Sequence, residues 1–376
     1  EWDRCRSVWN QCVEASNGAH RQSVETGVKL ECGPAQLDKR LTGWRAEHEW
    51  LAVGSSVAAQ QTVRDFGRAR AKALKDRKDK LPPRQRRGMP KFKSNHRAAP
   101  SLNYTLRGFV LDGPQVRLAG GIVVRPVWSR DLPGPPSSVR VSLDALGRWW
   151  CSLVVPRPQT ESLPATGRSI GIDWGVTDVA TTTSDDHDLP HPQHGRTAAA
   201  RLARYQRMMA RRKPVKGQAS SRGYKTAKRA VAKQHAHVAA QRADTGRKWA
   251  KAVAADFDQI AVEDFRPKFL AKSTMVRKAA DGAIAATKRA LIEQAGKRGR
   301  YLVLVDPKHT TTDCGNCGAR AKQRLPLSQR TYQCEHCGHV APRDKNSAHV
   351  IHNRAGFNPA GADGIRPDIS SSGQAA

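Results

Sequence analysis

Four cysteines near the end of the chain constrain its fold more than any other feature. They form two Cys-x-x-Cys pairs, Cys314 with Cys317 and Cys334 with Cys337, separated by sixteen residues. Each pair can place two thiolates beside one cation, and the glycine that follows each pair permits the tight turn this requires. Four thiolates match the tetrahedral preference of zinc. We therefore expect one structural Zn²⁺ with no open coordination position, although the spacing alone also admits iron.

The other four cysteines have no metal-ligand spacing, and we interpret them as reduced thiols: Cys5, Cys12, Cys32 and Cys151. A chain without a secretory signal belongs in a reducing compartment, where cysteine pairs hold metal more often than disulfides. No apolar run approaches the ~20 residues that a bilayer span needs. We expect a cytoplasmic protein that has no membrane partner. Because the chain begins with Glu1 and not with Met, we also expect further N-terminal sequence before it.

The charge balance predicts a polyanionic partner. The chain has 65 Lys and Arg against 33 Asp and Glu, a formal net charge of +32. Residues 64–97 contain fourteen Lys and Arg against three acids, and residues 196–251 contain seventeen against one. Nucleic acid is the best fit, because each neutralised phosphate releases condensed counterions. The first stretch could alternatively be a disordered basic linker. Candidate nucleic-acid contacts are Arg84, Arg86, Arg87, Lys91, Lys93, Arg211, Arg212 and Lys213.

Three acids on separate segments form a second candidate metal site. Asp173 follows the alternating Ile170 and Ile172, so its side chain is expected on the opposite face of that strand. Glu263 ends the apolar run at 260–262 in the same way, and Asp344 lies where a loop opens a helix. Converging carboxylates suit hard divalent cations. Two such ions about 4 Å apart could activate a water molecule and stabilise the leaving oxygen of a phosphodiester.

Taken singly, each of these acids could equally be an ordinary polar residue at a strand end. Only their order and setting favour a shared site. Asp264, Asp306 and Asp313 are weaker candidates.

Local patterns divide the chain into three regions. Residues 1–80 are predicted to be mostly helical, with a basic helix from about Val63 to Lys80. Residues 100–157 alternate with period two, which predicts a small antiparallel sheet or barrel. The expected strands there are Asn103–Leu111, Gln115–Leu118, Gly121–Val127, Ser138–Leu143 and Trp149–Val155. In the third region we expect strands at Ser169–Gly175, Gln259–Val262 and Tyr301–Val305, Ala-rich basic helices, and a helix from about Arg277 to Arg298.

An ordered set of motifs resembles the TnpB family, the transposon-encoded ancestors of compact type V CRISPR effector nucleases. The segments that carry the resemblance are Gly171–Gly175, similar to the first RuvC motif; Val262–Phe265, similar to the second; Asp306–Gly318 and Tyr332–Gly338, similar to the entry and exit of the zinc ribbon; and Asp344–Ala348, similar to the third. Gly88–Lys93 is similar to a stretch before the family's wedge strands. Ser347 and His349 depart from the family's usual residues without touching the acids.

The resemblance implies an α+β multidomain fold, with an RNase H-like RuvC nuclease domain, a zinc ribbon, a β-barrel wedge domain and a helical recognition lobe. On this basis we expect the recognition lobe at 1–88 and the wedge at 89–160. The RuvC domain with a basic helical insertion would occupy 161–306, the zinc ribbon 307–340 and the third RuvC motif 341–355. Residues 356–376, rich in Gly, Pro, Ser and Ala, are expected to be a disordered tail.

The resemblance also implies an activity, RNA-guided endonucleolytic cleavage of double-stranded DNA at a single RuvC site. Asp173, Glu263 and Asp344 would be the catalytic residues and would hold two Mg²⁺. Pairing with a guide RNA, together with a short flanking DNA motif, would choose the target. The partners would be that RNA, from a transposon end or a CRISPR array, and target DNA, with no small-molecule substrate; a bacterial protein of this kind would be nucleoid-associated when bound to DNA. The alternatives are a nuclease-inactive guided repressor and an unguided transposase or resolvase.

Overall fold

The computed structural model describes residues 1–83, 85–95, 98–156, 162–215, 217–265, 275–323, 325–326 and 328–357. The chain forms two compact units, Glu1–Pro158 (unit 1) and Gln159–Ala376 (unit 2). The tail expected at 356–376 lies outside the described residues from 358 onward. No helix within the described residues is long and apolar enough to cross a membrane.

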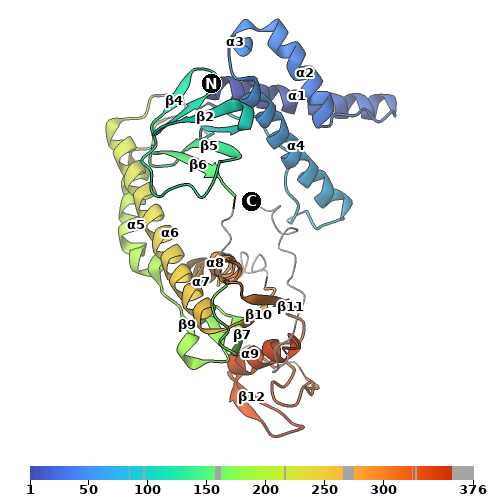
Figure 1. Ribbon diagram of the computed structural model, residues 1–376, viewed down its shortest axis with the longest axis vertical. Coiled ribbons are helices and arrows are strands. Elements are labelled where there is room, and N and C mark those ends of the chain that lie inside the picture. The colour runs from blue at the N-terminus through green and yellow to red at the C-terminus, as the bar shows by residue number, and fades with distance from the viewer. Residues whose placement is uncertain are drawn as a thin grey trace. The chain divides into compact units, whose positions relative to one another are not determined.

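Unit 1 begins with helices, as predicted for residues 1–80: α1 (Trp2–Thr26), α2 (Pro34–Glu47), the short α3 (Glu49–Ala52) and α4 (Ser56–Lys78) (Figure 1). Gly27, with a φ of 68°, ends α1. The hydroxyl of Ser55 accepts the backbone N–H of Ala58, so α4 begins before the predicted Val63. The helices share one core, which contains Val8, Cys12, Leu37, Leu51, Val63 and Phe66.

The rest of unit 1 is antiparallel sheet. Its strands are β1 (Ser101–Thr105), β2 (Phe109–Asp112), β3 (Gln115–Leu118), β4 (Ile122–Val124), β5 (Ser138–Leu143) and β6 (Trp149–Val154). The expected single strand Asn103–Leu111 was wrong, because a 3-10 turn at Leu106–Gly108 divides it. The strands form two sheets, ordered β1-β5-β6 and β2-β3-β4, over a common core. Among the described strands no pairing joins these sheets, so a closed barrel is not seen there.

Unit 2 is built on a five-stranded mixed sheet. Its strands are β7 (Ser169–Trp174), β8 (Asp178–Thr182), β9 (Leu189–Pro190), β10 (Gln259–Glu263) and β11 (Tyr301–Val305), in the order β11-β10-β7-β8-β9. β8 pairs antiparallel with both β7 and β9, whereas β10 and β11 are parallel to β7 on its other side. This meander followed by two parallel strands is the RNase H-like topology that the resemblance to the TnpB family implies.

Helices cover both faces of this sheet. The helices are α5 (His194–Arg211), α6 (Arg222–Asp256), α7 (Val276–Gly282), α8 (Ile284–Lys297) and α9 (Arg343–Arg354). α5 and α6 lie side by side as a long helical pair (Figure 1). α6 and α8 pack on the face that carries Ile170, Ile172, Ile260 and Val262. The helix expected from Arg277 to Arg298 is interrupted at Ala283, whose φ of 52° breaks the helical path.

α9 packs on the opposite face of the sheet, where Ile351 meets Ala261 and Val305. The isoleucines of β7 and β10, together with Val262, point to the other face, toward α6 and α8. A short hairpin, β12 (Thr331–Gln333) with β13 (Val340–Pro342), leads directly into α9. The two faces of β7 and β10 are therefore distinct, and α9 covers the one to which the candidate acids belong.

Candidate active site

Asp173 and Glu263 lie at the same level of two neighbouring strands. β7 and β10 are parallel, with Ile172 paired to Val262, and each acid follows one member of that pair. Because side chains alternate along a strand, both acids point to the face opposite the isoleucines. Asp173 is 8 % exposed and Glu263 is 6 % exposed. The strand register thus brings together two carboxyl groups that are ninety residues apart in the sequence.

Asp344 reaches the same place through the packing of α9 on β7. A Cβ atom added to Gly171 would lie 2.2 Å from the carbonyl oxygen of Ala348 and 2.9 Å from the backbone nitrogen of His352. Only a glycine therefore allows this close approach of helix to strand. Asp344 lies one helical turn before Ala348, in the first turn of α9, and Asp173 lies two residues after Gly171.

The three acids interact electrostatically. Burial, then the charges of Glu263 and Asp344, raise the pKa of Asp173 well above its ordinary value. Burial also raises the pKa of Glu263 to about 7, although a hydrogen bond from Thr310 opposes the rise. Buried carboxylates that repel one another in this way are stabilised by a divalent cation, whose preferred ligands are oxygen atoms.

Neighbouring side chains hold the acid cluster in place. The hydroxyl of Thr310 donates to Glu263 Oε1 at 3.4 Å. Lys345 Nζ donates to the carbonyl oxygen of Thr182 at 2.9 Å and pairs with Asp188 at 2.8 Å, which ties the first turn of α9 to β8. Sequence reasoning missed Thr310 and Lys345, because a threonine in a loop and a lysine on a helix carry no local signal of such contacts.

The three weaker candidate acids have other partners. Asp264 pairs with Lys288 at 2.6 Å, and a carboxylate oxygen of Asp306 accepts the backbone N–H of Lys308. Asp313 pairs with Arg320 at 2.7 Å and with Arg354 at 2.6 Å. Each of these three carboxylates therefore has a polar partner among neighbouring residues.

The four cysteines form a compact tetrad. The Sγ atoms of Cys314 and Cys337 are 3.7 Å apart, and so are those of Cys317 and Cys334. Four sulfurs about 2.3 Å from a central ion would be separated by about 3.8 Å in a tetrahedron. The tetrad therefore fits a tetrahedral ion such as Zn²⁺. Hydrogen bonding from the His339 backbone lowers the pKa of Cys337 to about 6, whereas burial and hydrogen bonds to the other three cysteines raise the pKa of Cys317.

The basic candidates occupy different environments. Arg86, Arg87, Lys91, Arg211, Arg212 and Lys213 are exposed, and Arg84 lies outside the described residues. Lys93 is half-buried, with its Nζ 3.7 Å from the centre of the Trp9 ring, and burial lowers its pKa. Lys93 thus packs against an aromatic ring, unlike the exposed candidates.

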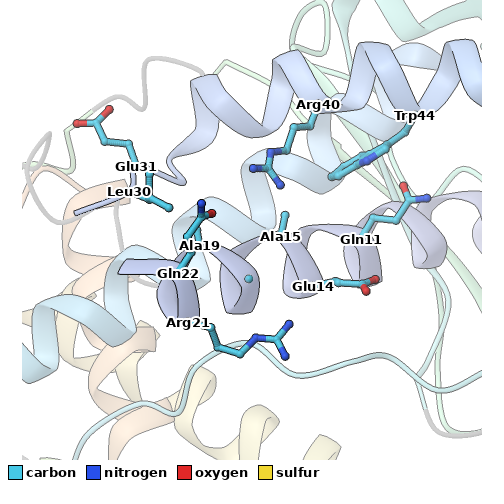
Figure 2. A pocket seen from close by; sticks show the side chains of 11 residues that line it. Gln11, Glu14, Ala15, Ala19, Arg21, Gln22, Leu30, Glu31, Arg40 and Trp44 are labelled. Atoms are coloured by element: carbon cyan, nitrogen blue, oxygen red, sulfur yellow. The ribbon is translucent and has the colours of Figure 1, made fainter. Parts of the chain in front are cut away.

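Unit 1 also contains a cavity of about 450 Å³ between α1 and α2. Figure 2 shows Arg40 and Trp44 reaching from α2 toward α1. Glu14, Glu31 and a second arginine, Arg21, also line it, so two acidic and two basic side chains balance. This balance gives the cavity no preference for a phosphate.

Two family models match the chain. Residues 152–274, which include Asp173 and Glu263, match the OrfB_IS605 family, described as "Probable transposase". Residues 285–351, which include Asp344 and the cysteine tetrad, match the family described as "Cas12f1-like, TNB domain".

Relatives align along nearly the whole chain. A Streptomyces pristinaespiralis protein named "Putative RNA-guided DNA endonuclease" is 31% identical over 374 residues, 98% of this chain and 87% of the relative. An Escherichia coli K12 protein named "Putative RNA-guided DNA endonuclease InsQ" is 25% identical over 370 residues, 92% of this chain and 85% of the relative. A solved structure of a Cas12f1–sgRNA–target DNA complex superposes with a TM-score of 0.56 at 12% identity, over 94% of this chain and 81% of that one. That likeness is one of fold.

Proposed function

Because this chain belongs to the TnpB family, we propose that it is an RNA-guided endonuclease that cuts double-stranded DNA at one RuvC-type site. The observation that carries the proposal is the convergence of Asp173, Glu263 and Asp344. Strand register brings the first two together, and the packing of α9 on Gly171 adds the third. Relatives named as RNA-guided DNA endonucleases support the same activity.

The three acids would hold two Mg²⁺ ions, and these would supply an activated water and stabilise the leaving oxygen of a phosphodiester. The chain's own part is to hold the carboxylates in register before DNA arrives. Burial keeps bulk water from screening the charges of Asp173 and Glu263, so each interaction there is stronger than at the surface. Lys345 fixes the turn that carries Asp344 against β8.

The remaining parts of the chain would hold nucleic acid. In a guided nuclease, base pairing with the RNA chooses the target, and the protein grips the hybrid duplex by its backbone. A surface rich in exposed Lys and Arg suits that task, and the low aromatic content of 6% fits a protein that relies little on base stacking. We assign the helices of unit 1 to a recognition lobe and its two sheets to a wedge domain, with the cysteine tetrad holding one structural Zn²⁺. The protein would act in the bacterial cytoplasm, on the nucleoid.

The test is cleavage by the purified protein supplied with its guide. Expressed with its flanking genomic sequence, the protein should co-purify with RNA, which sequencing identifies. That RNA, with Mg²⁺, should direct cleavage of a duplex that matches its guide segment and leave a scrambled duplex intact. An RNA-free preparation that cuts without a guide would favour a transposase or resolvase. Guided binding without any cutting would favour a repressor.

A further inference from the structure

The turn at Asp313–Gly318 (the knuckle), which contains Cys314 and Cys317, is held against α9 by three side chains of that helix. The Nδ2 of Asn346 donates to the carbonyl oxygen of Asp313 at 2.8 Å, and its Oδ1 accepts the backbone N–H of Gly315 at 2.8 Å. The Nδ2 of Asn353 donates to the carbonyl oxygen of Gly315 at 2.6 Å. Arg354 pairs with the Asp313 carboxylate. The residues on both sides of Cys314 are therefore fixed to one helix.

Asn346 is the centre of this clamp. Its side chain is fully buried, with 0 % of the residue exposed, and its amide uses both a donor and an acceptor on the knuckle. The fit is tight, because a Cβ atom added to Gly315 would lie 2.7 Å from the Cβ of His349 and 3.0 Å from the Asn346 carbonyl oxygen. A buried amide that loses such partners pays the cost of desolvation without compensation, so the clamp has one strongly preferred arrangement.

The same helix carries the third acid of the candidate active site. Asp344 lies two residues before Asn346, and Ala348, two residues after it, contacts the strand at Gly171. A shift of Asn346 along or around the helix axis would therefore move Asp344 relative to Asp173. Asn346, which contacts the knuckle, is therefore less than one helical turn away from Asp344 on one side and from Ala348 on the other.

We propose that Asn346 is a positioning residue that couples occupancy of the cysteine tetrad to the affinity of the acid cluster for divalent cations. This inference rests on the proposed function of the acids as Mg²⁺ ligands. A metal in the tetrad orders the knuckle, the ordered knuckle holds the Asn346 amide, and the amide sets the position of Asp344. Residues that orient metal ligands from outside the ligand shell typically change metal affinity by about 10- to 100-fold when removed.

The test measures Mn²⁺ binding in the absence of nucleic acid, so that it does not depend on cleavage. The electron paramagnetic resonance signal of free Mn²⁺ gives the affinity of full-length protein with and without Zn²⁺. The Mn²⁺ binding that is lost in Asp344→Ala is the binding at the acid cluster. We expect removal of Zn²⁺ to weaken that binding about 10-fold in the wild type. In Asn346→Ala with Zn²⁺ bound, Mn²⁺ binding should be weakened by a similar factor. Removal of Zn²⁺ from this variant should weaken it no further.

Ser347→Ala is the matched control. Ser347 is also buried in α9, but its hydroxyl donates to the Arg343 carbonyl oxygen within the helix and does not contact the knuckle. This variant should respond to Zn²⁺ as the wild type does. If Asn346→Ala does not fold by circular dichroism, Asn353→Ala carries the test, since that amide is exposed, and its Mn²⁺ affinity should respond less to Zn²⁺ than that of the wild type.

The proposal is overturned if Zn²⁺ removal leaves Mn²⁺ affinity unchanged in the wild type. It is also overturned if removal weakens binding equally in the wild type and in Asn346→Ala. Guided cleavage, measured separately, distinguishes the two hypotheses. If Mn²⁺ binding depends on Zn²⁺ but no cleavage is seen, only the proposed function is contradicted. If cleavage is normal but Mn²⁺ binding does not depend on Zn²⁺, only the coupling is contradicted.

Discussion

The carboxyl groups of Asp173 and Glu263 lie at the same level of two parallel strands and share a buried site. When two carboxyl groups share a site, one of them takes up a proton more readily than a free acid does. The pKa of Asp173 is raised well above its ordinary value, and that of Glu263 is raised to about 7. A divalent cation must displace this proton in order to bind.

Cleavage should therefore depend jointly on pH and Mg²⁺. Below about pH 7 the cation competes with a proton on Glu263, so apparent Mg²⁺ affinity rises as pH rises through about 7. At limiting Mg²⁺ we expect the rate to increase between about pH 6 and about pH 8. With increasing Mg²⁺ the midpoint of that increase should move to lower pH. Single-turnover cleavage at several Mg²⁺ concentrations measures the shift, and a midpoint independent of Mg²⁺ would contradict it.

Glu263→Gln should stabilise the protein in alkaline, magnesium-free buffer. The pKa of Glu263 rises from about 4.5 to about 7 on folding, so this group favours the folded state below about pH 4.5, and that contribution is lost as pH rises through about 7. At pH 8 the charged form costs on the order of 3 kcal/mol, which glutamine avoids. Thermal unfolding should give a higher midpoint for the variant at pH 8 and a vanishing difference near pH 4.5. The exposed Glu25→Gln serves as control, and no difference between Glu263→Gln and wild type at pH 8 would argue against the buried charge.

Gly171→Ala should separate α9 from β7. The added methyl group would overlap the Ala348 carbonyl oxygen, a backbone atom that cannot move without the helix. We expect destabilisation of about 3 kcal/mol or more, and a loss of cleavage on the order of 100-fold as Asp344 is displaced. Denaturant unfolding and guided cleavage measure the two effects.

Gly43→Ala is the control for that substitution. Gly43 lies in α2 with open space around its Cα, so alanine there should stabilise the helix by about 1 kcal/mol. Equal behaviour of the two variants would show that the contact between Gly171 and α9 is not what holds the site together.

The exposed basic residues of the 211–213 segment and the half-buried Lys93 should respond differently to substitution. Replacing the exposed Arg211, Arg212 and Lys213 by alanine should reduce the slope of log affinity against log salt by up to about 3, because each phosphate contact contributes about 0.9 on duplex DNA. Lys93→Ala should instead leave the slope unchanged and cost about 1 kcal/mol of stability, through the lost contact with Trp9. Filter binding at several salt concentrations and thermal unfolding test both. A reduced slope for Lys93→Ala alone would reverse the assignment.

Local patterns predicted the strands that carry the acids, and the reason is physical. Period-two alternation around Ile170 and Ile260 determines which face each side chain takes, so the direction of Asp173 and Glu263 follows from a few neighbouring residues. The cysteine spacing likewise determines a knuckle. No comparable pattern marks the turn at Leu106–Gly108 between β1 and β2, or the break at Ala283 between α7 and α8. One continuous strand and one continuous helix were therefore predicted there.

Non-local contacts could not be read from the sequence. The pairing of β7 with both β8 and β10 depends on the whole sheet, and so does the order of the strands. Asn346 has two partners that are more than thirty residues away, and nothing adjacent to it indicates them. Lys345 looks like an ordinary exposed helix residue until the fold places Thr182 and Asp188 beside it.

The most direct test of the acid site is guided cleavage by Asp173→Asn, with target binding measured on the same preparation. Asparagine keeps the size of the side chain but removes the charge that would hold Mg²⁺, so binding of guide and target should match the wild type while cleavage falls by about 1,000-fold or more. Wild-type cleavage by this variant would contradict the assignment of the site to Asp173, Glu263 and Asp344.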